Sequence, residues 1–441
     1  MAHAQAITNN NSAALRDVLS SRIPTIRQQR ASVEKYVSQG NSVYGFSTLL
    51  GHLDHVAGGD DSQKKLIDGH LVGSQSPMSP RRFRTVSYVK LAQLSLGGSG
   101  ISPETFKTIL SRASTWDETA FGNWTGSYSS GDVVQGAWWA YNIIGDTIKR
   151  GEVPAGDVIA LINGDFFSTG VALDVSTHLR ELFLRTLKVA CLLGSSERLS
   201  NGVALNNSDH YTVTRKTALW PHGVQPPVSL RDITPLVELI KNSYGSLMDT
   251  INSSIERPSG NPLFSFTDKT VQHHSQSSFL NFDLSQALLG ATDAVQKVSS
   301  HIQRYIQHYC AMAADQIEDQ DSVIFVQPPK VAAGILARIY GVNAQGTIPV
   351  LAESRGIEDV CDESLRRADV LEQAIDHAME LIKIFDDCVD QAQRRGISDK
   401  MHHAANVHAE ETERLFDQLE PMVFDGSLRQ HADQRRCSRS W

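Results

Sequence analysis

Histidine and serine side chains are the first candidates for chemistry in this chain, and their spacing decides which reactions they could support. The histidines are densest at His273-His274 and at His402, His403 and His408. None lies in an HExxH pattern, in which two histidines and a glutamate on one helix face serve zinc-dependent hydrolysis. A solvated helix face explains these histidines better, so we expect no metal site.

Serines lie between glycines in the segment 126–131 (Gly-Ser-Tyr-Ser-Ser-Gly). Their spacing differs from the GxSxG nucleophile elbow of serine hydrolases. The segment 97–100 (Gly-Gly-Ser-Gly) lacks the lysine of a phosphate-binding loop, so we expect no nucleotide. By residue type alone, Ser129-Ser130-Gly131-Asp132 is a turn that opens a helix, with Ser130 or Asp132 as its cap.

Long amphipathic helices are expected to position the reactive residues. From Leu284 onward, apolar side chains recur at steps of three and four residues, and a second stripe runs from Leu365 to Phe385. Helices of this length need partners along their whole length, so a bundle or an oligomer follows. The polar residues expected to face away from the first stripe are Asp293, Gln296, Gln303 and Gln307.

The fold class predicted from these patterns is mainly α. Shorter helices are expected over 13–39, 103–113, 131–150 and 166–193, and the best strand candidate is 322–326. Ser102 and Pro103 form a favourable helix start, because serine caps the helix and proline fits its first turn. We divide the chain into a loop-rich N-terminal helical part (1–200), a long-helix bundle (201–430) and a polar tail (431–441).

Composition narrows the class of protein. The 441 residues carry a net charge of −8, which leaves no basic face for nucleic acid or an anionic membrane. The N-terminal segment has no secretion-signal pattern, and no stretch approaches the roughly 20 apolar residues of a membrane span. The five cysteines are scattered and include no CxxC pair, which favours reduced thiols in a cytoplasmic protein.

Seven short segments, in order along the chain, together resemble motifs of the histidine and phenylalanine ammonia-lyase family. They are 43–51 (VYGFSTLLG, similar to YGxNTGFG), 66–73 (LIDGHLVG, to NLxxSHAAG), 161–169 (LINGDFFST, to LLNGTxxST), 225–231 (QPPVSLR, to QDPYSLR), 261–263 (NPL, to DNPL), 281–283 (NFD, to NFH) and 357–359 (IED, to QED). The resemblance implies a long-helix bundle of that family's type and a homotetramer with sites assembled from several subunits.

The family eliminates ammonia with an electrophilic ring, 4-methylideneimidazole-5-one, made from an internal Ala-Ser-Gly, which acts as an electron sink within the chain. The matching residues here are Ser129-Ser130-Gly131, where Ser130 would supply the methylene and Gly131 the attacking nitrogen. Ser129 replaces the alanine, Tyr128 replaces a glycine, and 133–136 (VVQG) replaces Leu-Ala-Pro-Leu. These changes affect the tight turn that must compress for cyclisation, so the ring and an ordinary capped turn are both open.

Further roles follow from the resemblance alone. Tyr44 matches the catalytic tyrosine that takes the β-proton. Asn163 and Gln225 match amides near the ring and the substrate amine. Arg231 matches the arginine that grips the substrate carboxylate, for which a planar bidentate donor is well suited.

The choice of substrate would depend on a second group of residues. His70 and Glu358 match the family's histidine branch, which favours a polar or basic substrate side chain. Val228 stands where the family has a second tyrosine, so an altered substrate or outcome is expected. Phe282 would remain as an apolar wall.

The sequence therefore predicts a carbon–nitrogen lyase that releases ammonia from a histidine-like or tyrosine-like amino acid or a derivative. One alternative is an aminomutase, which returns the ammonia to the β-carbon. Another is an enzyme on the same fold that works without the ring, by acid/base elimination, cyclisation or isomerisation. A catalytically silent scaffold is the last alternative, against which the retained Tyr44, Asn163 and Arg231 argue.

Overall fold

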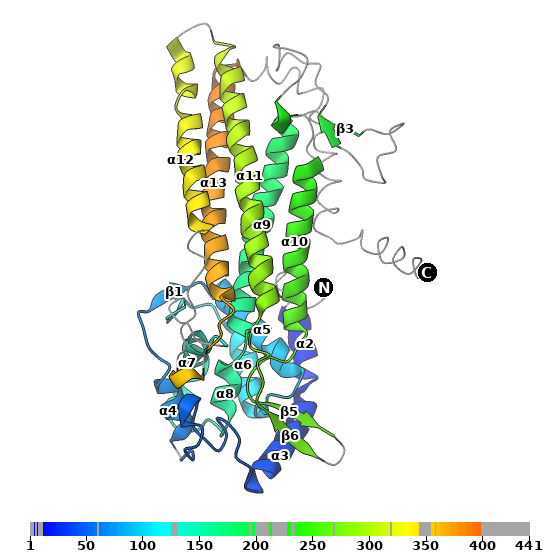
Figure 1. Cartoon of the computed structure of the whole chain (residues 1–441), viewed down its shortest axis with the longest axis vertical. Coiled ribbons are helices and arrows are strands. Elements are labelled where there is room, and N and C mark those ends of the chain that lie inside the picture. Colours follow the sequence, from blue (N-terminus) through cyan, green and yellow to red (C-terminus); the bar gives the residue numbers. More distant parts are fainter. Residues whose placement is uncertain are drawn as a thin grey trace, which may run out of the picture. The chain divides into compact units, whose positions relative to one another are not determined.

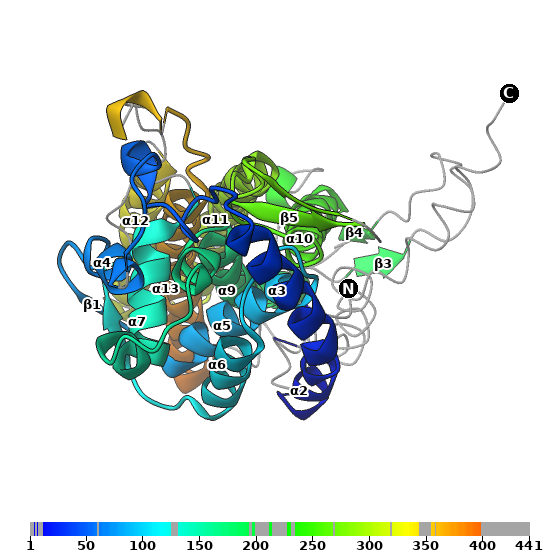
Figure 2. The ribbon, with the colours of Figure 1, turned by 90° about the horizontal axis from the view of Figure 1, so that it is seen from below.

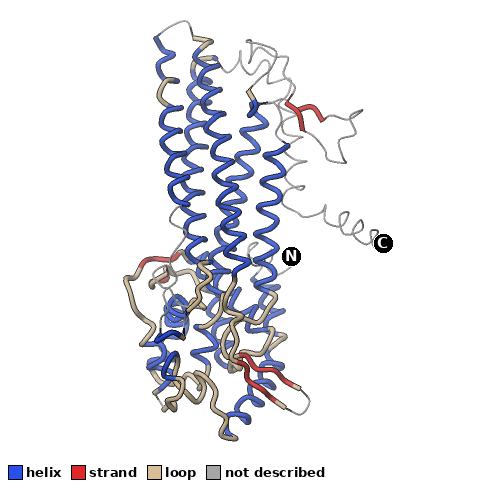
Figure 3. Tube along the Cα trace, viewed as in Figure 1, coloured by secondary structure: helices blue, strands red, loops and turns tan. Residues whose placement is uncertain are grey.

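The computed structural model describes most of the chain and is mostly helical. It describes residues 4, 7, 12–59, 61–124, 131–193, 196–198, 211–213, 227–230, 234–267, 270–317, 320–343, 354–357 and 359–397. Within these residues the strands form three two-stranded antiparallel sheets, and helices make up most of the rest (Figure 3). The mainly α fold class is confirmed.

The elements have the following bounds. The α-helices are α2 (Ser12–Ser20), α3 (Ile23–Ser38), α4 (Ser62–Asp68), α5 (Pro80–Ser95), α6 (Pro103–Thr115), α7 (Val133–Lys149), α8 (Asp157–Ile162), α9 (Phe166–Leu193), α10 (Thr234–Ile255), α11 (Phe282–Ala314), α12 (Pro328–Asn343) and α13 (Ser364–Arg394). The sheets pair β1 (Ser76–Met78) with β2 (Ala120–Gly122), β3 (Ser196–Arg198) with β4 (Tyr211–Val213), and β5 (Leu263–Phe266) with β6 (Val271–His274). Short 3-10 helices are η1 (Gly51–Leu53), η2 (Val228–Leu230), η3 (Gln320–Phe325) and η4 (Ser354–Gly356).

Most predicted helices are present. The helices α6, α7 and α9 lie where they were expected, and α11 and α13 contain the two apolar stripes. Ser102 caps α6 as predicted, since its hydroxyl accepts a hydrogen bond from Thr105 N at 3.2 Å. The helix expected over 13–39 is divided into α2 and α3 at residues 21–22.

Two details of the predicted elements are wrong. The strand expected at 322–326 is largely the 3-10 helix η3. Gln296 and Gln303 were expected to face away from the core, but both are buried. Gln296 reaches the carbonyl of Ile339 in α12, at 3.5 Å, so a neighbouring helix covers the polar side of α11 there. A periodic stripe shows which face is apolar but not how many neighbours surround a helix.

The chain forms two compact units, each made from three separate segments. The first unit contains Met1–Val175, Met248–Leu288 and Gly346–Asp369, and the second contains Ser176–Leu247, Leu289–Gln345 and Val370–Trp441. The predicted domain limit at residue 200 lies outside the described residues and stays a prediction.

In the first unit, α5 packs against α6 (Figure 2), and α7 and α8 pack in very close contact. A Cβ atom placed on Gly136 of α7 would lie 2.9 Å from the Ile162 Cα atom, at the end of α8. Only glycine allows this approach, because any larger residue would push the two backbones apart. Gly136 belongs to the segment that departs from the family pattern, and it sets the position of the residue after α8, Asn163.

In the second unit, α11, α12 and α13 run side by side (Figure 1). The Tyr309 and Phe385 rings join α11 to α13 with their centroids 5.3 Å apart. Arg338 of α12 pairs with Glu380 of α13 at 2.8 Å. Long apolar helices are thus stabilised by their neighbours along their length, as the stripes predicted.

Two stretches in the described part of the chain are apolar and long enough to be compared with membrane spans. Within residues 157–190, the most apolar window of 18 residues is 94% buried inside the protein, as expected of a core helix. Within residues 320–342, the corresponding window is 22% buried. This stretch is not one continuous α-helix, because it comprises η3 and then α12, which has 16 residues. A 16-residue helix is about 24 Å long, which is shorter than the roughly 30 Å hydrocarbon core of a bilayer.

Candidate active site

Asn163 and Gly131, both predicted site residues, lie against each other. Asn163 ends α8 in an extended conformation, and the next residue, Gly164, donates its amide hydrogen to the Gly131 carbonyl at 3.0 Å. A Cβ atom on Gly131 would lie 3.3 Å from Asn163 Nδ2 and 3.0 Å from Phe279 Cβ. With a φ of +83°, Gly131 also adopts a backbone conformation that other residues rarely adopt.

The side-chain amide oxygen of Asn163 is a hydrogen-bond acceptor that no described donor uses. Asn163 is 7% exposed, and its buried Oδ1 atom has no hydrogen-bond partner within the described part of the chain. A buried acceptor without a donor costs about 1–3 kcal/mol, and such an atom in a native site points to a missing ligand or group. Because the Asn163 amide lies against Gly131, its Oδ1 acceptor is available to a group formed from the chain at Gly131, as the ring would be.

A buried lysine supports Asn163 from α5. Lys90 is fully buried, and its Nζ atom donates to the Asn163 carbonyl at 2.9 Å and lies 4.3 Å from the centre of the Phe166 ring. Burial lowers the pKa of Lys90 to about 7, because the ammonium loses its hydration, while the charge of Asp165 opposes the shift. Lys90 therefore holds the loop at Asn163 in place and gains or loses its proton near neutral pH.

Asp132 does not cap the helix that it precedes. It stands in the left-handed conformation at the start of α7, with a φ of +53°, and makes no side-chain cap there. Its Oδ2 atom instead accepts a hydrogen bond from Ser168 N, in the first turn of α9, at 2.9 Å. Burial, followed by the charge of Asp362, raises the pKa of Asp132 to about 7.

The raised pKa of Asp132 predicts a pH-dependent effect on stability. Since the folded-state pKa lies above the unfolded value of about 3.9, ionisation of Asp132 opposes folding as the pH rises from about 4 towards 7. We expect Asp132→Asn to raise the free energy of unfolding by less than about 1 kcal/mol at pH 5 and by about 2 kcal/mol at pH 8, both values being reduced by the half-buried position of the side chain.

Urea unfolding at the two pH values measures this difference. The exposed residue Asp117 offers a matched control, because Asp117→Asn on the protein surface should change the free energy of unfolding by no more than about 0.5 kcal/mol at either pH. A gain for Asp132→Asn that is equal at pH 5 and pH 8 would show that the Asp132 carboxylate is not the titrating group.

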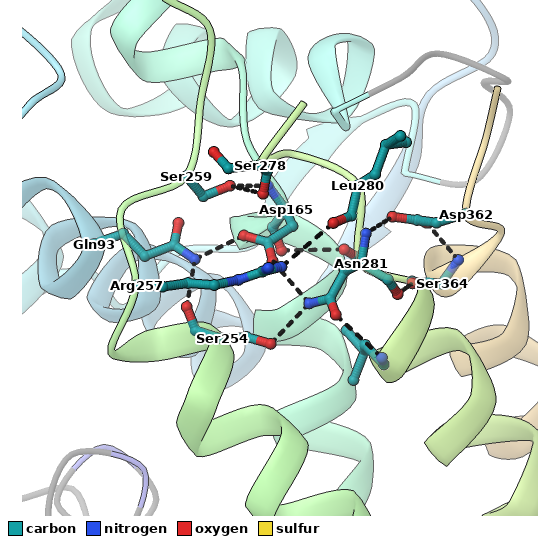
Figure 4. A network of polar contacts seen from close by, with 12 residues as sticks. Gln93, Asp165, Ser254, Arg257, Ser259, Ser278, Leu280, Asn281, Asp362 and Ser364 are labelled. Carbon is teal, nitrogen blue, oxygen red and sulfur yellow. Dashed lines mark hydrogen bonds and ion pairs between the residues drawn. The ribbon is translucent and has the colours of Figure 1, made fainter. Parts of the chain in front are cut away.

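Asp165 is the centre of a buried polar network (Figure 4). Its Oδ1 atom accepts from Gln93 Nε2 at 2.8 Å, and its Oδ2 atom accepts from Arg257 and from Asn281 Nδ2, each at 2.7 Å. These donors come from α5, from the segment after α10 and from the residue before α11. One carboxylate therefore joins three distant parts of the chain next to Asn163.

The same network reaches the start of α13 (Figure 4). The backbone N–H of Asn281 donates to Asp362 Oδ2, and Ser364 N donates to Asp362 Oδ1 at 2.9 Å. The Ser364 hydroxyl returns a hydrogen bond to the Asn281 carbonyl at 2.9 Å. The starts of α11 and α13 are thereby held together. The predicted site residue Glu358 lies shortly before α13 in the sequence.

The remaining described site residues lie in the same unit. Gly51 N donates to the Tyr44 phenol oxygen at 2.9 Å, which holds that oxygen as an acceptor. The Nδ1 atom of half-buried His70 is 2.6 Å from the Leu66 carbonyl, so Nδ1 carries the hydrogen and Nε2 is left as an acceptor. Phe282 is the first residue of α11 and is 53% exposed.

Five predicted site residues lie outside the described part of the chain: Ser129, Ser130, Gln225, Arg231 and Glu358. Val228, which replaces the family's second tyrosine, is described and 75% exposed in η2. The roles assigned to all of these residues stay predictions.

Lys90, Asp165 and Asp362 were not predicted from the sequence as residues of the site. Asp165 had a usable signal, since it places a carboxylate where the LLNGTxxST pattern has threonine. A charge in a segment that is otherwise apolar needs buried partners. Lys90 and Asp362 had no such signal, because their partners are distant in the chain.

Comparison with known proteins identifies the family of this chain and confirms its fold. Residues 3–382 match the family described as aromatic amino acid lyase. Histidine ammonia-lyase from Alkaliphilus metalliredigens is 22% identical over 307 residues, which cover 58% of this chain and 60% of that protein. Histidine ammonia-lyase from Caenorhabditis elegans is 34% identical over 89 residues, covering 19% of this chain and 13% of that protein. The matched regions thus span less than two thirds of these relatives.

Solved structures share the fold over nearly the whole chain. Phenylalanine aminomutase from Pantoea agglomerans has a TM-score of 0.72 and 16% identity, covering 92% of this chain and 91% of that one. Histidine ammonia-lyase from Trypanosoma cruzi has a TM-score of 0.66 and 17% identity, covering 92% and 88%. At such identities the likeness shows the helical fold of ammonia-lyases and aminomutases. The protein belongs to the aromatic amino acid lyase family.

Proposed function

We propose that this protein is a carbon–nitrogen lyase that releases ammonia from an α-amino acid, using an electrophilic ring formed from Ser129-Ser130-Gly131. The observation that carries the proposal is the contact between Asn163 and Gly131. It places the side-chain amide of Asn163, whose buried Oδ1 atom has no hydrogen-bond partner among the described residues, against the last residue of the ring-forming segment. When formed, the ring supplies an electrophile that makes the substrate amine a better leaving group.

Other residues of the chain would bind the substrate and remove its β-proton. The Asn163 Oδ1 atom accepts a hydrogen bond from the substrate amine or from the ring, and Lys90 fixes the backbone of that loop. The Tyr44 phenol takes the β-proton, and Gly51 orients its oxygen as an acceptor. Arg231 binds the substrate carboxylate, and Gln225 stands near the amine.

The substrate side chain would meet His70, Glu358 and Phe282. With Nδ1 bound to the Leu66 carbonyl, His70 offers Nε2 as an acceptor for an N–H or O–H group. This supports a histidine-like or tyrosine-like substrate, or a derivative, over phenylalanine. The homotetramer and the cytoplasmic location expected from the sequence belong to the same proposal.

The mass of the purified protein tests the ring directly. We expect the intact mass to be lower than the sequence mass by two water molecules, and the deficit to lie in the tryptic peptide 113–149, which contains all three ring-forming residues. Ser130→Ala is the matched control, because it removes the hydroxyl that becomes the methylene, and its mass should equal its sequence mass.

An unmodified mass in protein that still turns over an amino acid would contradict the ring and leave the alternative of acid/base chemistry by Tyr44 and its neighbours. Product analysis separates the other alternative. Ammonia with an unsaturated acid is the result expected of a lyase, whereas a β-amino acid without free ammonia would identify an aminomutase.

A further inference from the structure

Two cysteines that are distant in the sequence are in contact in the second unit. Cys310 lies in α11 and Cys388 in α13, 78 residues further along the chain, and their Sγ atoms are 3.5 Å apart. Both are buried, with 2% and 3% of their surface exposed, and both are free thiols. A disulfide needs the sulfurs at about 2.05 Å, so both side chains must rotate towards each other to form the bond.

One of the two thiols lies in the wall of a pocket. The pocket has a volume of about 310 Å³ and lies between η3, the start of α12 and one face of α13. Along α13 it is lined by Ile384, Asp387, Cys388 and Gln391, which are spaced at steps of three and four residues and so share one face. Cys310 does not line it. A small molecule that enters the pocket therefore meets Cys388 and has Cys310 directly behind it.

The contact between the two thiols suits this arrangement. A hydrogen bond between them stabilises the thiolate of the cysteine that accepts it, and either sulfur can be the donor. When Cys310 donates, the bond lowers the pKa of Cys388, although burial and the charge of Asp387 oppose the shift. Cys388 is the thiol that faces the pocket, and the thiolate is the reactive form of cysteine.

We propose that Cys388 and Cys310 form a redox modification site, in which Cys388 reacts with a hydroperoxide that enters the pocket and Cys310 completes a disulfide. The Cys388 thiolate attacks the outer peroxide oxygen, the O–O bond breaks, and the alcohol or water leaves with a proton. Cys388 is then a sulfenic acid. Cys310 loses its proton and attacks the Cys388 sulfur, and water leaves. The two thiols supply the two electrons that reduce the hydroperoxide.

Peptide mapping of the protein without substitutions tests the proposal. Trypsin places Cys310, Cys361 and Cys388 in three different peptides, 305–330, 356–366 and 384–394. After mild treatment with hydrogen peroxide, we expect peptides 305–330 and 384–394 to be joined, with the loss of two hydrogens and recovery on reduction. Cys361, which is half-buried, serves as the internal control and should stay reduced under the same treatment. Oxidation of Cys361 while the pair stays reduced would overturn the proposal.

Single substitutions establish the order of the steps. In Cys310→Ser, Cys388 should stop at the sulfenic acid and be captured by dimedone, whereas Cys388→Ser should give no dimedone adduct on Cys310. Equal capture on either cysteine would refute the assignment of Cys388 as the reacting thiol.

A further pair of variants tests access through the pocket. Val331 lines it and is 53% exposed, whereas Val323 is 64% exposed and does not line it. Val331→Trp should slow disulfide formation at least several-fold, and Val323→Trp should leave the rate unchanged. Equal rates in the two variants would show that hydroperoxide does not reach Cys388 by this pocket.

Discussion

Asn163→Ala is expected to lower kcat/KM for ammonia release by a factor of about 10² to 10³. The substitution removes the buried amide whose oxygen is unpaired beside Gly131. A preorganised hydrogen-bonding group in a water-excluded site contributes about 3–4 kcal/mol to the stabilisation of the transition state. The loss should fall mainly on kcat, because the hydrogen bond matters most when charge develops on the leaving amine.

Steady-state kinetics with the best substrate from an amino-acid screen measures this loss. Asn252 provides a matched control, since it is also a buried asparagine with an unpaired Oδ1 atom, and its amide donates to the Met248 carbonyl within α10. Asn252→Ala should leave kcat/KM within about twofold. Equal losses in the two variants would mean that Asn163 acts through general stability and not at the reacting atoms.

Asp165→Ala is expected to lower the free energy of unfolding by about 3–5 kcal/mol. Asp165 is 1% exposed and accepts hydrogen bonds from Gln93, Arg257 and Asn281. Gln93 and Asn281 keep their hydrogen bonds to Ser254, but one buried N–H of each loses its partner when the carboxylate is removed. The half-buried Arg257 also loses its counter-ion, and removing one partner of an ion pair leaves the other charge uncompensated. Asp165→Asn keeps the acceptor atom but not the charge, so its loss should be smaller.

Chemical denaturation measures both variants, and an exposed ion pair supplies the control. Arg338 and Glu380 are 2.8 Å apart, nearly the same distance as Arg257 and Asp165, but both of their side chains are about half exposed. Because water and salt screen that pair, Glu380→Ala should cost no more than about 1 kcal/mol. If the two alanine variants lost the same stability, burial of the Asp165 network would not be the source of its effect.

The helices and several of their ends could be predicted from the sequence, because the information that specifies them is local. Steps of three and four residues between apolar side chains specify α11 and α13. A hydroxyl followed by proline specifies the start of α6 at Ser102. Short motifs were enough to predict the family and to select Asn163 and Gly131, which lie together in the structure. Each of these conclusions depends on residues that are close in the chain.

Only the tertiary structure shows which of these helices and side chains contact one another. Asp132 was a plausible cap for its own helix, yet it accepts from Ser168 at the start of another. Gln93, Asp165 and Asn281 form one network, and Cys310 and Cys388 form one pair, although long stretches of chain separate them. Such contacts depend on which helix faces pack and how closely, as at Gly136 against Ile162. A periodic pattern shows that a face is buried, but it does not show which partner buries it.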